Sequence, residues 1–184
     1  MSIADYVAAL FPLSELLIAL KRRAKEKGTV VDDRGSLRRM WQIILISIIV
    51  AVVAKKIFPH TIFEKSVSDG LALGLLFMGM AIRWYSIIYL GKYFTVNVAI
   101  VANHQLVQSG PYKYVRHPSY AGLLIAFLGL GILNNNWIGL FFLTVPVFSA
   151  IAYRIKVEEA VMLAEFTSYQ KYAHRTKKLI PFAY

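Results

Sequence analysis

Cysteine is absent from this chain of 184 residues. Its absence excludes disulfide bonds, a thiolate nucleophile and a metal ion held by cysteine. Acidic residues are scarce, since ten Asp and Glu stand against twenty-one Lys and Arg and give a net charge of +11. A basic stretch is also missing from the first residues, where the charges are those of Asp5 and Glu15, so no signal peptide is expected.

Apolar residues, by contrast, are abundant. They make up 58% of the chain, and the mean hydropathy is +0.54. Soluble domains usually contain roughly 45–50% apolar residues, so the composition indicates a membrane protein. In such a chain a positive balance is typical of cytoplasmic loops and of contact with anionic lipid. We therefore expect membrane lipids as partners, and no nucleic acid.

The apolar runs predict an all-α integral membrane protein with about five transmembrane helices, at 3–20, 40–57, 70–90, 118–133 and 137–153. The first run would rise only about 27 Å, so an interfacial helix is its alternative. Three consecutive asparagines, 134–136, predict a tight turn that makes the last two spans a short helical hairpin. We expect an amphipathic C-terminal helix over 154–172, and a basic, aromatic tail over 174–184 that lies along the membrane interface.

The basic residues also predict an orientation. With five spans, one side of the membrane would carry the segments 21–39, 91–117 and 154–184, which hold eight, three and six Lys or Arg. The other side would carry only Lys55, Lys56 and Lys65. Because cytoplasmic loops are enriched in Lys and Arg, the three basic segments are predicted to face the cytoplasm. Arg83 lies inside a predicted span, where it either marks a functional site or extends to the interface.

One polar stretch, 103–120, lies between the two hydrophobic halves. Pro118 is suited to the first position of a helix, because the N–H group that proline lacks would be unpaired there. Arg116 and His117 would then lie at a helix N-terminus, which favours anions. The stretch is interpreted either as a ligand site at the membrane surface or as a basic loop that contacts lipid headgroups.

A second polar group follows the last predicted span. Arg154 and Glu158 are four residues apart and therefore share one helix face, which we expect to meet the 103–120 stretch. The alternative is an exposed salt bridge of about 0.3–0.5 kcal/mol. His104, His117 and Glu158 could form a two-histidine, one-carboxylate metal set, but the usual histidine spacings are missing, and no metal is expected.

These residues are similar to a known family. The blocks that carry the likeness are His104-Gln105-Leu106-Val107, Gly110-Pro111-Tyr112, Arg116-His117-Pro118-Ser119-Tyr120-Ala121-Gly122 and Arg154 to Glu159. The chain from about 90 to 184 resembles the isoprenylcysteine carboxyl methyltransferases and their prokaryotic relatives. It departs from the family's pattern at Phe166-Thr167-Ser168-Tyr169, which puts the end of the C-terminal helix in question.

The resemblance implies a methyltransferase that uses S-adenosylmethionine, with a cytoplasmic cofactor pocket formed by 91–117. It implies a membrane-spanning region over 1–90 and a catalytic region over 91–184. It also implies a lipophilic or prenylated acceptor whose carboxylate meets Arg154. The implied cofactor contacts are His104, Gln105, Leu106, Val107, Tyr112, His117, Pro118, Ser119, Tyr120 and Glu158. We expect His117 to position a ligand by hydrogen bonding rather than to act as a base.

Three other functions fit parts of the sequence. Sterol C14-reductases look similar at the Arg-His-Pro block and use NADPH, but they are longer and lack the Arg154–Glu158 pair. A phospholipid or amine methyltransferase would keep the cofactor and change the acceptor. A membrane scaffold with a lipid-binding basic face would bind neither S-adenosylmethionine nor NADPH. The membrane would be the plasma membrane in a prokaryote and the endoplasmic reticulum in a eukaryote.

Overall fold

The computed structural model describes residues 10–18, 28–30, 35–94, 99–101 and 106–181. Its helices are a short one over 10–18, α2 (Ser36–Ile57), α3 (Lys65–Leu90), α4 (Pro118–Asn134), α5 (Trp137–Glu165) and α6 (Tyr169–Arg175). Two 3-10 turns, η1 (Gly91–Tyr93) and η2 (Gly110–Lys113), lie between α3 and α4. The strands β1 (Gly28–Val30) and β2 (Ala99–Val101) pair antiparallel, a small addition to the all-α prediction.

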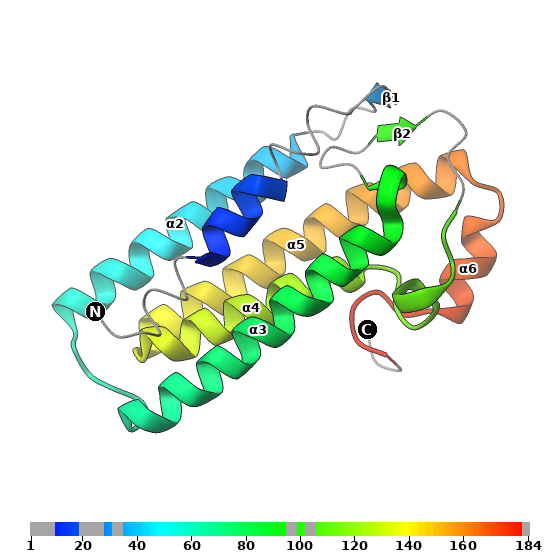
Figure 1. Ribbon diagram of the computed structural model, residues 1–184. Helices are drawn as coiled ribbons and strands as arrows, with labels where there is room; N and C mark the ends of the chain where they lie inside the picture. Colours follow the sequence, from blue (N-terminus) through cyan, green and yellow to red (C-terminus); the bar gives the residue numbers. More distant parts are fainter. Residues whose placement is uncertain (1–9, 19–27, 31–34, 95–98, 102–105, 182–184) are drawn as a thin grey trace.

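The four long helices lie side by side along the molecule (Figure 1), with α3 against α4, α2 against α5, and α4 against α5. Their apolar faces form one core, in which Ile44, Leu76, Leu123, Phe127 and Val147 are buried. Both halves of the sequence contribute to that core. The division into a membrane-spanning part and a catalytic part therefore stays a prediction about function and does not separate two cores.

Three of the described helices are long and apolar enough to cross a membrane: Ser36–Ile57, Ser66–Tyr93 and Trp137–Glu165. The fourth, Pro118–Asn134, has 17 residues. It would rise about 25 Å, somewhat less than a bilayer core of roughly 30 Å. Of the predicted first span only 10–18 is described, so the count of five stays a prediction. The long exposed apolar side chains on α2, α3 and α5 fit contact with lipid.

The asparagine turn between α4 and α5 is confirmed. Asn135 adopts the left-handed conformation with φ of 53°, which asparagine tolerates. Asn136 caps α5 by accepting hydrogen bonds from the N–H groups of Ile138 and Gly139. The Asn135 side chain also accepts from the N–H groups of Ile62 and Phe63, at 3.0 and 2.9 Å. The turn thus fixes the α2–α3 connection at this end of the molecule.

The hairpin of α4 and α5 is confirmed, but the prediction that a separate amphipathic helix begins at Arg154 is wrong. Instead, α5 runs unbroken from Trp137 to Glu165, so Arg154 lies in its interior. The chain leaves the helix at Phe166, which has extended φ and ψ of −119° and 107°, and re-enters a short one in α6. This break falls where the sequence departs from the family's pattern.

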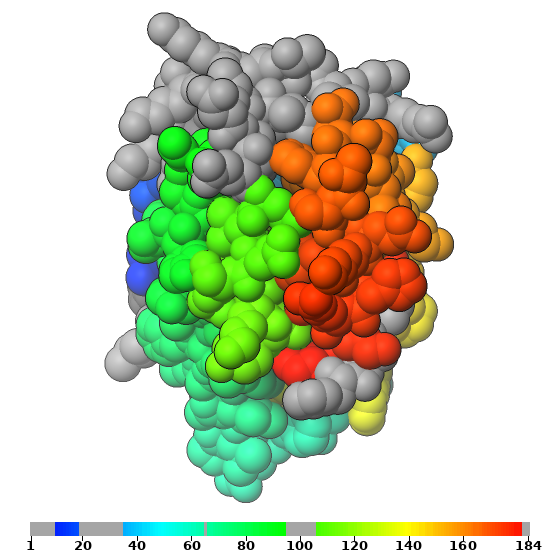
Figure 2. Space-filling view, turned by 90° about the vertical axis from the view of Figure 1, so that its right-hand side faces the viewer, coloured from blue at the N-terminus to red at the C-terminus, as the bar shows by residue number. Residues whose placement is uncertain are grey.

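The C-terminal tail packs against the start of α4, and its predicted place along the membrane interface stays a prediction. Val115 pairs with Lys177 in a parallel bridge, and the N–H groups of Arg116 and His117 donate to the carbonyls of Lys177 and Lys178 at 2.8 and 2.9 Å. Leu179 is 4% exposed and belongs to the core. Figure 2 shows the 106–117 stretch lying against the C-terminal segment at this end of the molecule.

Candidate active site

Arg154 is the most deeply buried charged side chain among the described residues, with no exposed surface. Its Nε donates to Glu158 Oε1 at 2.8 Å, one turn further along α5. Its Nη1 donates to Ser36 Oγ at 2.7 Å, and Ser36 is the first residue of α2. A buried charge needs a partner and further hydrogen bonds, and here two helices supply them.

Glu158 connects this arginine to α4. Tyr120, in the first turn of α4, donates its hydroxyl to Glu158 Oε1 at 2.5 Å, so that one oxygen accepts from both Tyr120 and Arg154. The other oxygen, Oε2, lies 3.8 Å from His117 Nδ1. The glutamate side chain is 20% exposed, which makes it the more accessible member of the buried pair.

A second carboxylate lies beside the first. Glu159 Oε1 accepts from Arg116 Nε at 2.7 Å and lies 3.2 Å from His117 Nε2. Glu159 Oε2 pairs with Lys178 Nζ at 3.1 Å. His117 is therefore placed between two carboxylates, with one ring nitrogen toward each. This arrangement fixes the ring orientation at the point where α4 begins.

Arg116 joins the polar stretch to the C-terminus. Besides Glu159, it donates to the carbonyl oxygens of Ala173, at 2.8 Å, and Thr176. The side of the site away from α5 is thus built by α6 and the residues that follow it. Since the backbone pairing of 115–117 with 177–178 lies in the same place, the tail is a structural part of the site.

Two tyrosines brace the turn before α4. Tyr172 in α6 donates to the Tyr112 carbonyl at 2.6 Å, and Tyr112 donates to the Ser86 carbonyl of α3 at 3.2 Å. Burial raises the pKa of Tyr172 to about 12 and that of Tyr112 further. Both hydroxyls therefore stay protonated and remain donors at neutral pH.

A further ion pair lies beneath the start of α4. Arg83 of α3 donates through Nε and Nη2 to the carboxylate of Glu15, the second bond being 2.6 Å long. Its Nη1 lies 3.3 Å from the Ser119 carbonyl. Arg83 is 7% exposed, so it does not extend to the interface as one of the two predictions held.

The site can now be compared with known proteins. Residues 72–164 match the family model described as "Isoprenylcysteine carboxyl methyltransferase (ICMT) family". This match spans half of the chain and contains α4 and all but the last residue of α5. The chain belongs to the ICMT family. The matched part begins within α3, earlier than the resemblance in the sequence suggested, and it ends before the tail.

Two relatives show how far the likeness to other ICMT proteins extends. A Schizosaccharomyces pombe protein-S-isoprenylcysteine O-methyltransferase is 35% identical over 65% of this chain and 52% of its own length. The chain thus spans about half the length of that relative. The Arabidopsis thaliana protein-S-isoprenylcysteine O-methyltransferase B is 26% identical over 94% of this chain and 88% of its own length.

The solved structure of a eukaryotic intramembrane Ras methyltransferase ICMT has a similar fold. It superposes with a TM-score of 0.62 and 23% identity, over 79% of this chain and 53% of that one. At that identity the likeness concerns the fold alone. It agrees with an integral membrane protein of the ICMT type.

Several of the predicted site residues lie together. Tyr120, Glu158, Arg154 and His117 form the connected cluster described above. Pro118 and Ser119 are buried at the start of α4, as expected for its first turn. The backbone N–H groups of His117, Tyr120 and Ala121 already donate to carbonyls, and Pro118 has none, so Ser119 supplies the N–H that this turn can offer to an anion.

Other predicted contacts are not joined to this cluster. Tyr112 turns its hydroxyl toward α3 and pairs its ring with Tyr89, at 6.5 Å between centroids. Leu106 and Val107 are half-buried in the stretch that leads to η2. His104 and Gln105 lie outside the described residues, as does part of the predicted 91–117 pocket and of the alternative metal set.

Three contributors to the site were not predicted. Ser36 is 118 residues away from Arg154, and nothing in its own neighbourhood in the sequence points to a site. The sequence pattern includes Glu159 only as the end of the block from Arg154 to Glu159, and Lys178 only as part of the basic tail. The sequence holds one indication that Glu159 has partners of its own. Two consecutive glutamates on a helix point in different directions, so Glu158 and Glu159 need separate sets of partners.

Proposed function

We propose that the chain is an integral membrane methyltransferase that uses S-adenosylmethionine to methylate a carboxylate on a lipophilic acceptor of the isoprenylcysteine type. The observation that carries this proposal is the buried Arg154–Glu158 pair with Tyr120 and His117, within the part of the chain that matches the family. The family match favours a methyltransferase over a reductase that uses NADPH.

The cluster suits the groups that the cofactor carries. When bound, S-adenosylmethionine supplies a methyl group on a positively charged sulfur, which a carboxylate oxygen can attack in line. Its ammonium and ribose hydroxyls are hydrogen-bond donors that suit Glu158 Oε2, the oxygen that faces His117. Its own carboxylate suits the Ser119 N–H at the start of α4. These residues would bind and orient the cofactor.

The acceptor is assigned to Arg154. A guanidinium matches a carboxylate through two parallel hydrogen bonds, and its plane must be fixed for this purpose. Glu158 and Ser36 fix that plane from two helices. In a buried site the attraction between guanidinium and carboxylate is also less weakened by water.

The reaction asks for little chemistry from the protein itself. An ionised carboxylate is already the nucleophile, so no side chain has to remove a proton. Rate enhancement then comes from holding the attacking oxygen, the methyl carbon and the sulfur in line. We assign His117 to this positioning, because the carboxylates of Glu158 and Glu159 fix both sides of its ring.

Methyl transfer to a synthetic acceptor tests the proposal. Purified protein in detergent would receive S-adenosylmethionine with a labelled methyl group and N-acetyl-S-farnesylcysteine. We expect a base-labile methyl ester, formed roughly 100-fold more slowly by Arg154→Lys, since lysine cannot reproduce the planar fork and misplacement of the reactants has a cost of that order. Arg175→Lys is the matched control, because Arg175 is exposed on α6.

Equal rates for Arg154→Lys and the wild type would contradict the role of Arg154. Label that appears instead on the amine of phosphatidylethanolamine would show an N-methyltransferase and overturn the assignment of the acceptor. Failure of the wild type to label any acceptor while it binds the cofactor would contradict the acceptor class alone.

A further inference from the structure

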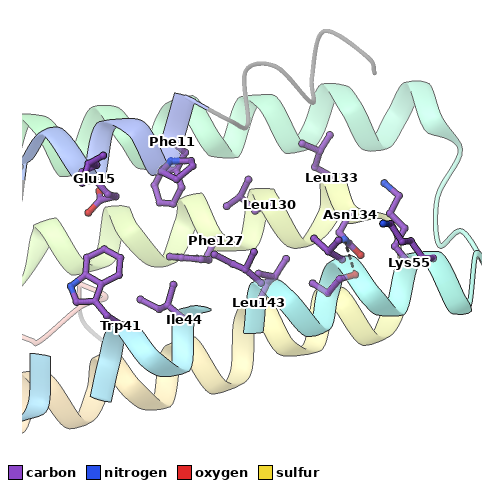
Figure 3. A pocket seen from close by; sticks show the side chains of 16 residues that line it. Phe11, Glu15, Trp41, Ile44, Lys55, Phe127, Leu130, Leu133, Asn134 and Leu143 are labelled. Atoms are coloured by element: carbon purple, nitrogen blue, oxygen red, sulfur yellow. Dashed lines mark hydrogen bonds between the residues drawn. The ribbon is translucent and has the colours of Figure 1, made fainter. Parts of the chain in front are cut away.

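A groove of about 610 Å³ runs along α2 on the side that faces the helix over 10–18, α4 and α5. Its walls are almost entirely apolar. Figure 3 shows Phe11, Ile44, Phe127 and Leu143 along its length. From Trp41 to Lys55, α2 rises about 21 Å, which accommodates an extended acyl chain of ordinary length.

Exposed positive charge lies at one end of this groove, whereas Glu15 at the other end is paired with Arg83. Glu15 and Trp41 lie at one end, and Lys55 lies with Asn134 at the other (Figure 3). Lys56, which also lines the groove, follows Lys55 in the last turn of α2, and both lysines are exposed. An elongated ligand with one anionic end would therefore be oriented with that end at the lysines.

The lysine end is far from the candidate active site. Ser36, which holds Arg154, is the first residue of α2, whereas Lys55 and Lys56 are in its last turn. The separation along the helix is about 28 Å, close to the thickness of a bilayer core. An occupant with its charge at the lysines thus belongs to the membrane leaflet on the other side from Arg154.

The floor of the groove at this end is held by hydrogen bonds. Asn134 donates through Nδ2 to the Ala51 carbonyl at 3.2 Å and so ties α4 to α2. Asn136 donates to the Phe58 carbonyl at 2.6 Å, just beyond the lysines. Lys55 and Lys56 are therefore carried by a fixed helix end rather than by a free loop.

We propose that this groove binds an anionic phospholipid, with the phosphate at Lys55 and Lys56 and one acyl chain along the groove toward Trp41. Basic side chains at the mouth of an apolar groove between membrane helices are suited to an anionic headgroup. The lipid would fill the groove between the helix over 10–18 and α2. This inference goes beyond methyl transfer and does not depend on it.

Native mass spectrometry of the purified chain in detergent, with equal amounts of phosphatidylglycerol and phosphatidylcholine, tests the proposal. We expect the wild type to retain phosphatidylglycerol preferentially. The double variant Lys55→Ala/Lys56→Ala should lose roughly thirtyfold of that preference, the effect of two lysines near a headgroup. The double variant Lys113→Ala/Lys171→Ala, which removes two exposed lysines at the other end, should keep it.

A second pair of variants tests the acyl chain. Val52 lines the groove, whereas Val53 is exposed outside it. We expect Val52→Trp to reduce retention of both lipids and Val53→Trp to leave it unchanged. Equal retention of the two lipids by the wild type would overturn the proposal. Displacement of the retained phosphatidylglycerol by N-acetyl-S-farnesylcysteine would assign the groove to the methyl acceptor and would also overturn it.

Discussion

Among the residues that the structure describes, two arginines are buried, and each is held by a carboxylate. Arg154 pairs with Glu158 within α5, and Arg83 pairs with Glu15 between α3 and the helix over 10–18. The first pair belongs to the candidate active site. The second supports it from beneath, since Arg83 also reaches the Ser119 carbonyl at the start of α4.

Removal of Arg83 tests how much this support contributes to stability. We expect Arg83→Met to lower the free energy of unfolding by about 3–5 kcal/mol, because Glu15 is left as an unpaired buried charge. The double variant Arg83→Met/Glu15→Leu should recover most of the loss. Unfolding by sodium dodecyl sulfate in mixed micelles measures both, with Arg38→Met as an exposed control. If the double variant were as unstable as Arg83→Met, the loss of stability would not come from the unpaired charge of Glu15.

At the residue scale, the sequence predicted the contacts that depend on local spacing. Arg154 and Glu158 are four residues apart, so a helix alone brings them together. The partners of Arg116, by contrast, come from Glu159 and from the backbone of Ala173 and Thr176. Such contacts depend on how α4, α5 and the tail are placed in space, and no short pattern encodes that placement.

At the scale of elements, α3 and α4 approach each other closely enough for their backbones to touch. An added Cβ at Gly79 would lie 2.5 Å from the Ala126 nitrogen and the Gly122 carbonyl oxygen, and one at Gly122 would lie 2.6 Å from the Gly79 carbonyl oxygen. The two backbones are therefore in direct contact there. Small residues permit this in membrane helices, where packing drives association.

A bulkier side chain at this crossing should separate the helices. We expect Gly79→Val to lower the free energy of unfolding by about 1–3 kcal/mol. It should also displace Tyr120 from Glu158 and so weaken ligand binding. Gly74→Val is the matched control, because a Cβ at Gly74 meets nothing within 4 Å. Thermal unfolding in detergent measures the difference. Equal effects of the two substitutions would mean that helix propensity, rather than the crossing, is responsible.

Hydropathy alone does not locate the end of α5. The sequence becomes polar at Arg154, and this change was interpreted as a helix boundary, but α5 continues to Glu165. A change in polarity marks where a helix leaves the apolar environment. A helix ends only where its backbone hydrogen bonds end, and no Gly or Pro lies between Pro146 and Glu165 to end them. The asparagine turn was predicted correctly because its signal concerns the backbone itself.

The whole molecule has two distinct ends. One carries the cluster around Arg154 together with α6 and the tail, and the other carries the asparagine turn and Lys55 and Lys56. That the Arg154 end faces the cytoplasm stays a prediction, which rests on the basic residues of the described parts of 91–117 and 154–184 at that end.

The absence of cysteine allows this orientation to be measured directly. Thr61→Cys and Gln108→Cys each place one thiol at an exposed position, near opposite ends of the molecule. In intact cells we expect a membrane-impermeant maleimide to label Thr61→Cys at once, and Gln108→Cys only after permeabilisation. The reverse pattern would invert the orientation and place the site outside the cytoplasm.

The central claim is that Glu158 and its neighbours bind S-adenosylmethionine, and calorimetric titration of the purified chain in detergent tests it most directly. We predict saturable binding that Glu158→Gln weakens by at least about tenfold, the loss of a charge-assisted hydrogen bond. Glu165→Gln, an exposed glutamate at the end of α5, should leave it unchanged. Binding of NADPH alone, or binding of S-adenosylmethionine that is equal in all three proteins, would contradict the account.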